Sequence, residues 1–489
     1  MSRHRGADSL LSDSPSPDRS PKVAASLWRH PDFLRLWGAQ TIAMLGSRVT
    51  ELALPLTAIL LLDAGPTSLG LLNVAEYLPF TLVTLFAGVL ADRYRRRGLL
   101  IGANVGRALI LAVVPVLALT DQLSMTALYV VAFLVGVLTS QFDVAYQAYV
   151  PVLVSRAQLV EANSKLQSTR SIAETGGKGF SGVLIQVFTA PGAIIVDCLT
   201  YLISAVSLLS IKTREPRRPA AARGFSGVWS EIGEGLRATL GHRILRAVLL
   251  QAAWFNLFHD VVLVLFPLYG LKDLELTPAL LGFIIASASV GAFGGSLIAG
   301  ALARRLGIGP AMVAGVLTSA LGLLVLPLAA GPPAVQALLL GAGYVISGVG
   351  ITIFNIHSVA LRQAIIPNRL LGRVSGTYRF VAWAVIPLGG LLAGALANVL
   401  SARGALLIAG IGLVIGAMVF ALTPAGRIAE APEGPEDLDG PDGPGGHGGP
   451  GGHGGPGGHG GPGGHGGPDS RGGPGSAPLA GLKHSDEPR

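Results

Sequence analysis

The sequence predicts an all-α polytopic membrane protein with twelve transmembrane helices in two pseudo-symmetric six-helix bundles. Three observations predict this fold class: few charges, a succession of apolar stretches, and patterns of the first half that return in the second. Of the 489 residues, 50% are hydrophobic and 13% are charged, whereas a soluble domain carries about 25% charged residues. So few charges can hardly cover a water-soluble surface of this size, and a lipid bilayer is therefore the expected environment.

From Leu34 onward the chain is a succession of apolar stretches of about 20 residues, the length of helix that crosses ~30 Å of hydrocarbon. The expected spans are residues 35–62, 68–91, 98–119, 125–150, 168–188, 192–211, 245–269, 279–303, 308–330, 334–358, 374–399 and 404–423. The fifth and tenth spans carry several polar residues and are the weakest of the twelve.

The Lys and Arg residues of the loops lie almost entirely on one side. Loops after even-numbered spans contain nearly all of them, and loops after odd-numbered spans hold only Lys272 and Arg403. Since cytoplasmic loops carry the excess of Lys and Arg, both termini are predicted to be cytoplasmic, in a multi-pass protein of the cell membrane. The bases lie between apolar runs rather than on one polar face, so no nucleic-acid partner is expected.

The spacing of the spans predicts five segments. Residues 1–33 contain SPSPDRSP and no apolar signal segment, which predicts a disordered cytoplasmic tail. Residues 34–211 and 245–424 form the two bundles, and residues 425–489 form a second disordered cytoplasmic tail, rich in Gly, Pro and His. The cytoplasmic linker 212–244 is expected to hold an amphipathic helix, with a plain basic linker as the alternative. Its apolar face would consist of Trp229, Ile232, Leu236 and Leu240.

Two patterns recur at nearly the same separation along the chain. GVLADRYRRR begins at Gly88 after the second span, and GALARRLG begins at Gly300 after the eighth. Likewise YQAYVPVLVSR places Pro151 at the end of the fourth span, and LRQAIIPNRLLGR places Pro367 at the end of the tenth. Duplicated halves are indicated, and parallel repeats of this kind place a substrate site at the midplane between them.

At these residues the chain resembles the major facilitator superfamily. The superfamily signature G-x-L-A-D-R-x-x-R-R is matched by Gly88, Leu90, Ala91, Asp92, Arg93, Arg96 and Arg97. More narrowly, the chain is similar to the drug-efflux branch that contains the enterobactin exporter and macrolide-efflux proteins. The matching segments are FDVAYQAYVPVLV (142–154), LVEANSKLQSTRS (159–171), DCLTYLISA (197–205) and IPNRLLGRVSG (366–376). The resemblance implies a secondary transporter that exports small amphipathic drugs or secondary metabolites by alternating access, in antiport with protons.

The loop signature has a mechanical interpretation that rests chiefly on this resemblance. Asp92 can accept hydrogen bonds from a helix N-terminus and from Arg93 or Arg96. Gly88 lets two helices approach closely. The signature residues Gly88, Asp92, Arg93, Arg96 and Arg97 are therefore predicted to form a cytoplasmic conformational gate. Simple anchoring of the basic loop inside the cell is the alternative.

Two positions depart from the family pattern. Lys178, in GGKGFSG, stands where the branch usually has the proline of a Gly-Pro pair in its fifth span. Arg304 replaces the acidic residue in the second copy of the loop signature. The working gate is therefore expected in the first half. A buried lysine either has a depressed pKa or finds a carboxylate, and Glu76, Asp143 or Glu174 is the expected partner.

Charged side chains inside spans cost several kcal/mol unless they face a cavity or a partner. The candidates for substrate binding or proton coupling are Arg48, Glu51, Glu76, Arg107, Asp143, Lys178, His259 and Asp260. Structural alternatives remain open for most of them. Arg48 and Glu51, three residues apart, can neutralise each other, and Arg107 and Asp143 can form a salt bridge between neighbouring helices.

Three further positions carry weaker signals. His259 lies in a polar patch with Asn256 and Asp260 and can relay protons, because histidine titrates near neutral pH; an interhelical hydrogen bond is the alternative. Asp197, near the outer start of the sixth span, is expected to cap that helix. In the C-terminal tail, repeated histidines on a Gly/Pro chain can bind Ni²⁺, Cu²⁺ or Zn²⁺, with an inert linker as the alternative. These weak metal candidates are His447, His453, His459 and His465.

The sequence contains no enzyme motif. It has no G-x-x-x-x-G-K-[ST] loop, H-E-x-x-H, nucleophile elbow or paired cysteines, and Cys198 is its single cysteine. We expect no enzymatic activity, no cofactor and no direct use of ATP. The expected partners are the lipid bilayer, a small-molecule substrate and protons. A siderophore or metallophore exporter is the alternative within transport, and a non-transporting membrane sensor or metal-binding scaffold is the alternative from another class.

Overall fold

The computed structural model describes residues 27–429, apart from residues 94, 156–157, 214 and 216–224. Within these ranges the chain forms helices joined by short connections and contains no strand. For residues 84–93, 175, 225–232 and 368–369 only the backbone is described. The predicted all-α fold class is confirmed.

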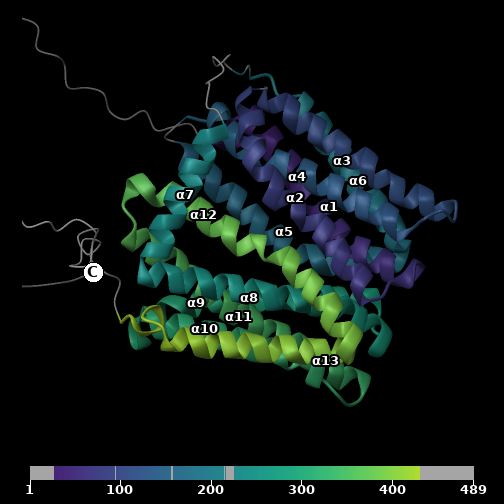
Figure 1. The fold of residues 1–489 in the computed structure, drawn as a ribbon. Coiled ribbons are helices and arrows are strands. Elements are labelled where there is room, and N and C mark those ends of the chain that lie inside the picture. Colours follow the sequence, from purple (N-terminus) through teal and green to yellow (C-terminus); the bar gives the residue numbers. More distant parts are fainter. Residues whose placement is uncertain (1–26, 94, 156–157, 214, 216–224, 430–489) are drawn as a thin grey trace, which may run out of the picture. The chain divides into compact units, whose positions relative to one another are not determined.

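Six long helices form the first half and lie together in Figure 1. They are α1 (Pro31–Leu61), α2 (Pro66–Arg93), α3 (Arg96–Leu119), α4 (Met125–Leu153), α5 (Leu159–Phe188) and α6 (Ala190–Leu209). Local capping sets two of the starts. The side chain of His30 accepts a hydrogen bond from the backbone N–H of Phe33 at the start of α1, and Ser124 does the same for Ala127 at the start of α4.

The second half repeats this construction after a linker helix. The linker helix is α7 (Phe225–Gly241), within the predicted linker 212–244. The helices of the second half are α8 (Arg243–Leu268), α9 (Pro278–Leu306), α10 (Ile308–Leu324), α11 (Pro333–Ile365), α12 (Asn368–Ala384) and α13 (Ile386–Leu422). The side chain of Arg373 on α12 donates a hydrogen bond to Glu234 on α7, so the linker helix is attached to the second half.

Among the described residues, nine helical stretches are long and apolar enough to cross a membrane. The helices α2 and α5 are not among these nine, and α5 carries charged residues along much of its length. The stretch Leu370–Leu422 counts once but covers the last two predicted spans. Multi-pass membrane architecture is therefore established, and the number twelve stays a prediction.

The eleventh predicted span, 374–399, is not one unbroken helix. The chain leaves the helix at Val385, between α12 and α13. Pro387 has no N–H, and its ring clashes with the carbonyl of residue 383 in a continuous helix. A second interruption lies at Ser401, where a φ of 76° separates the two halves of α13. This break falls in the expected connection between the last two spans.

The folded region is longer than predicted at both ends. Leu27, placed in the N-terminal tail, belongs to a short 3₁₀ turn and is fully buried. At the other end, the backbone N–H of Gly309 donates to the carbonyl of Ile428 at 2.8 Å. Residues 27–33 and 425–429 therefore pack against the bundles, although the sequence placed them in the tails. The remainder of both predicted tails lies outside the described residues.

Two glycine crossings bring the halves of the molecule together. A Cβ on Gly70 of α2 would lie 2.2 Å from the carbonyl oxygen of Gly390 on α13. A Cβ on Gly182 of α5 would lie 3.0 Å from the Cα of Gly282 on α9. Only residues without side chains permit such close backbone contact. These crossings fix which helices face each other across the interface.

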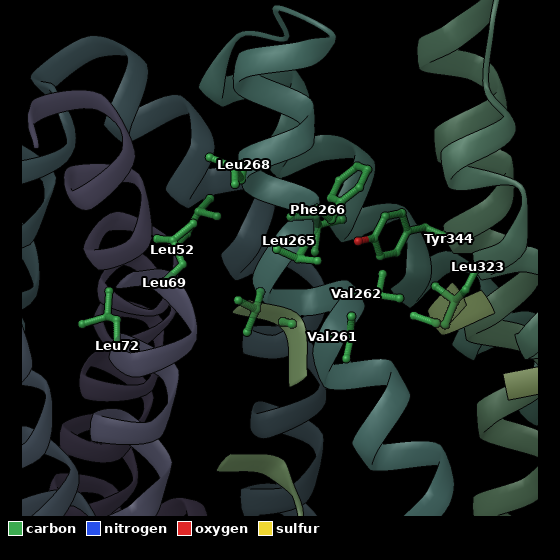
Figure 2. Close-up of a cluster of buried hydrophobic side chains, with 14 of the residues drawn as sticks. Leu52, Leu69, Leu72, Val261, Val262, Leu265, Phe266, Leu268, Leu323 and Tyr344 are labelled. Carbon is green, nitrogen blue, oxygen red and sulfur yellow. The ribbon is translucent and has the colours of Figure 1, made fainter. Parts of the chain in front are cut away.

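An apolar cluster continues across the same interface. Leu52, Leu69 and Leu72 of the first half belong to one cluster of buried side chains with Val261, Leu265 and Phe266 of α8 (Figure 2). The ring of Phe266 meets that of Tyr344 on α11 edge to face, with centroids 5.0 Å apart. Because lipid tails are as apolar as leucine, this cluster stabilises the interface by close packing rather than by removal from water.

Candidate functional site

A small cavity lies between the two halves, with a volume of about 100 Å³. We call it the inner pocket. Helices α1, α2, α5, α8 and α9 contribute to its wall. Its ionisable side chains are Arg48, Glu51, Glu76, Tyr77, Lys178 and Asp260, and apolar side chains such as Leu52, Leu69 and Val264 complete it. Five of the eight candidates for binding or coupling are thus brought together: Arg48, Glu51, Glu76, Lys178 and Asp260.

Arg48 and Glu51 form an ion pair on one side of the pocket. Nη1 of Arg48 lies 2.7 Å from a carboxylate oxygen of Glu51, and Nη2 lies 3.8 Å from Glu174 on α5. Glu174 also pairs with Arg170 at 3.1 Å. A Cβ on Gly177 would lie 2.7 Å from Cγ of Arg48, so this glycine leaves room for the arginine beside α5. The expected mutual neutralisation of Arg48 and Glu51 is present.

Glu76 and Asp260 face the same pocket from opposite halves of the molecule. Nδ2 of Asn73 donates a hydrogen bond of 3.2 Å to Oδ1 of Asp260. Asp260 is 3% exposed, and its Oδ2 is buried with no hydrogen-bond partner. Glu76 interacts electrostatically with Glu51 and Asp260, which are like charges. Ionisable oxygen atoms therefore remain available inside the pocket.

Lys178 does not have the partner that the sequence suggested. Among the described side chains, no carboxylate oxygen lies within 4.0 Å of its Nζ, so pairing with Glu76, Asp143 or Glu174 is wrong. Glu174 is instead held by two arginines. Lys178 interacts over a longer range with Glu51 and His259. Its position in a glycine-rich segment of α5 places it on the wall of the inner pocket.

The polar patch expected on α8 is divided between different surroundings. Asp260 faces the inner pocket, whereas Nδ2 of Asn256 donates to the carbonyl of Ala382 on α12 at 2.7 Å. The ring of His259 stacks on Phe255 with centroids 5.3 Å apart. The three residues therefore do not act as one patch.

Two larger cavities, with volumes of about 390 and 710 Å³, follow along the interface. We call them together the vestibule. Both are lined by Gln40, Met44, Asp143, Arg170 and Trp383, and the smaller one shares Arg48, Glu51, Glu76 and Tyr77 with the inner pocket. The vestibule thus adjoins the inner pocket and carries polar and aromatic side chains from both halves.

Arg107 and Asp143 border the vestibule without forming a salt bridge. Arg107 is 4% exposed, and its guanidinium lies between the rings of Phe142 and Tyr201, 4.5 and 4.2 Å from their centroids. It also donates a hydrogen bond to Asn104. No ion pair within 4.0 Å joins Arg107 to Asp143 among the described side chains, so the salt bridge that the sequence left open is not formed there, although the two charges interact over a longer range. Two aromatic faces stabilise this cation instead.

The ends of α1 show where the interface is open and where it is joined. The larger cavity of the vestibule includes Trp37 and Gln40, in the first third of α1. Just beyond its far end, Asp63 is paired with Lys272 of the second half, and the hydrogen bond and charge of Lys272 hold the pKa of Asp63 below its usual value. Nearby, Asn398 donates a hydrogen bond of 2.6 Å to Thr67. Polar contacts therefore join the halves at the end opposite the vestibule.

The predicted gate is described only in part. The side chains of Gly88, Asp92 and Arg93 lie outside the described residues. Arg96 donates to the carbonyl of Ala148 on α4, and Arg97 donates to that of Leu208 near the end of α6, each at 3.0 Å. These cations meet carbonyl groups near helix C-termini, where positive charge is favourable. The gate itself stays a prediction.

Asp197 has a role that the sequence did not reveal. It lies two turns inside α6, which begins at Ala190, so the predicted capping is wrong. The side chain is fully buried and accepts hydrogen bonds from Thr50 of α1 and Thr200 of its own helix. The only sign of this role in the sequence is a charged residue deep within an apolar stretch.

The four tail histidines lie outside the described residues. Among the residues that the structure describes, no group of side chains suited to a metal ion occurs.

Two bundles of helices with a charged pocket between them define a polytopic membrane transporter of the major facilitator type. Residues 23–438 match the family described as transmembrane secretion effector, and the chain belongs to this family. The resemblance found in the sequence is confirmed.

Named relatives and solved structures agree with this family. The multidrug efflux pump Tap of Mycolicibacterium fortuitum is 27% identical over 377 residues, which are 76% of this chain and 90% of the relative. Macrolide efflux protein A of Streptococcus pyogenes is 24% identical over 272 residues, 55% of this chain and 66% of the relative. The crystal structure of the nucleoside transporter NupG has a TM-score of 0.63 at 13% identity, covering 80% of this chain and 98% of that one. These proteins are transporters, which agrees with the expectation of no enzymatic activity.

Proposed function

We propose that this protein is a secondary active transporter that exports small amphipathic drugs or secondary metabolites by alternating access, in antiport with protons. The observation that carries the proposal is the inner pocket. It places carboxylates of both halves in an apolar interior, where charge is tolerated only if it is used or compensated. The names of the two efflux relatives support the direction of transport and the class of substrate.

The vestibule supports an inward-facing arrangement. Its larger cavity is lined by Trp37 near the beginning of α1 and by Pro151 and Leu159 on either side of the connection between α4 and α5, one of the loops that carry the Lys and Arg residues. The rule of positive cytoplasmic loops then makes this the cytoplasmic side, with both termini in the cytoplasm. A substrate would enter through the vestibule, reach the inner pocket, and leave after the contacts around Asp63 and Lys272 separate.

Protonation supplies the coupling in this proposal. Glu51, Glu76 and Asp260 are the carboxylates of the inner pocket, and a proton on one of them removes a buried negative charge. Protons arriving from outside would favour return to the inward-facing state after substrate release. Each carboxylate can thus bias the balance between the two states by its charge.

Reconstituted protein tests the proposal directly. Proteoliposomes with an acidic interior should accumulate ethidium several-fold over protein-free liposomes, and nigericin, which dissipates the pH gradient, should abolish this. A macrolide offered in the same assay tests a second amphipathic compound. Equal accumulation with and without protein for both compounds would refute proton-driven export.

A further inference from the structure

The charges of the inner pocket do not balance. Arg48 is held by Glu51 at 2.7 Å, so these two cancel. Glu174, the next carboxylate on α5, is held by Arg170 at 3.1 Å. The groups that remain are one cation, Lys178, and two carboxylic acids, Glu76 and Asp260. With both acids ionised, the pocket therefore carries one net negative charge.

The unused oxygen of Asp260 shows where a ligand charge can be received. Its Oδ1 is occupied by Asn73, but its Oδ2 is buried without a partner. No Lys or Arg nitrogen lies within 4.0 Å of Asp260 or Glu76 among the described side chains. A buried carboxylate oxygen without a partner is costly and favours a cation or a proton beside it.

Lys178 limits how much positive charge can be added. Its ammonium is tethered to α5 and lines the pocket that Glu76 and Asp260 also line. The other ionisable groups that face it are Arg48 and Glu51 of α1, Tyr77 of α2 and His259 of α8. One further positive charge makes the pocket neutral, whereas two leave it positive. The neighbouring part of the vestibule, about 390 Å³, can take the apolar body of a ligand whose cationic group enters the pocket.

We propose that Lys178 sets the charge of the substrate. The inner pocket accepts an amphipathic monocation, which one proton can replace, and Lys178 excludes dications because its charge leaves the pocket with only one net negative charge to be compensated. This inference rests on the proposed function, since it specifies the substrate class of that transporter.

Ethidium and propidium test the proposal, because they share one ring system and propidium carries an additional quaternary ammonium. Binding of each to purified protein in nanodiscs is measured by fluorescence. Wild type should prefer ethidium. Lys178→Met should raise propidium affinity relative to ethidium by about tenfold or more, because it removes a repulsive unit charge from a poorly screened pocket.

Three variants separate charge from packing. Lys178→Arg keeps the charge and should keep the wild-type preference. Lys212→Met removes an exposed lysine that follows α6 and should change nothing. The double variant Lys178→Met/Asp260→Asn has the original net charge again and should return the affinity ratio to that of wild type. A merely structural role of Lys178 would not produce this return.

The outcomes separate this inference from the proposed function. An affinity ratio that stays the same in Lys178→Met overturns the inference, and so does wild type that binds neither dye. If Lys178→Met does not fold, Asp260→Asn alone decides, because it should weaken ethidium binding by about tenfold. If Lys178→Met changes the ratio of propidium to ethidium affinity but the wild type shows no proton-driven accumulation, the role of Lys178 in excluding dications is upheld and the proposed antiport is refuted.

Discussion

Glu76 is the residue at which proton coupling is most directly testable. Glu76→Gln keeps the shape of a side chain that lines the inner pocket but cannot ionise. We expect pH-driven accumulation of ethidium in proteoliposomes to fall by about tenfold or more, because a neutral amide cannot take up and release a proton in the membrane interior. Glu161→Gln is the matched control, because Glu161 of α5 does not line the inner pocket and its carboxylate lies 3.5 Å from Nζ of Lys165 on the same helix. Full accumulation by Glu76→Gln would assign coupling to another carboxylate.

Arg107 offers a test of stability at the same scale. Its guanidinium lies between two rings, at 4.5 and 4.2 Å from their centroids, a planar arrangement that an ammonium group cannot reproduce. We expect Arg107→Lys to lower stability by about 1–2 kcal/mol, measured as a lower midpoint of thermal unfolding in detergent. Arg305→Lys, at an exposed position, should leave the midpoint unchanged. A midpoint equal to that of wild type in both variants would show that the stacking contributes nothing.

Single side chains show what the sequence predicted and what it did not. Spacing along one helix predicted the contact of Arg48 with Glu51, because three residues place two side chains on neighbouring faces. The surroundings of Lys178 and Arg107 depend on which helices pack together and on how far the helices are shifted along one another. One sequence does not contain that information, so the salt bridges considered for these two residues are not formed among the described side chains.

At the scale of helices, hydrophobic length predicted the elements well, and chain breaks were harder to place. The interruption at Val385 follows from Pro387, yet apolar residues continue through it. The beginning of α5 at Leu159, ahead of the predicted span 168–188, was missed because its first turns are polar. Polar turns at the end of a membrane helix give no hydropathy signal, although the helix continues.

The crossing of α5 and α9 makes a prediction about helices. A Cβ on Gly182 would lie 2.5 Å from the carbonyl oxygen of Pro278, whereas a Cβ on Gly176 of the same helix meets nothing within 4 Å. Gly182→Ala should therefore destabilise the arrangement in which the halves are joined at the end opposite the vestibule, by about 1–3 kcal/mol. Gly176→Ala should not have this effect. The measurement is maleimide labelling of Leu69→Cys, in the inner pocket, in a Cys198→Ser background. Labelling should become about fivefold faster or more in Gly182→Ala, and equal rates in both glycine variants would contradict this.

For the whole molecule, the arrangement of cavities and contacts along the interface matters more than any one residue. The inner pocket lies between the vestibule and the contacts of Asp63 and Thr67 with the second half. Opening the joined end requires separation of these contacts and of the glycine crossings, while the vestibule closes. In the proposed alternating-access cycle, the halves would rotate about the inner pocket as two units.

Deletion of the C-terminal tail distinguishes a transporter from a sensor. The backbone bonds between Ile308–Gly309 and Ile428–Ala429 are the last described contacts of the chain, so deletion of residues 432–489 leaves them in place. A transporter whose substrate path consists of the inner pocket and the vestibule should keep its rate of ethidium accumulation within about twofold and its unfolding midpoint. A sensor or metal-binding scaffold that acts through the four tail histidines would lose its function. A truncated protein that folds but no longer accumulates ethidium would therefore contradict the assignment of transport to the helical bundles.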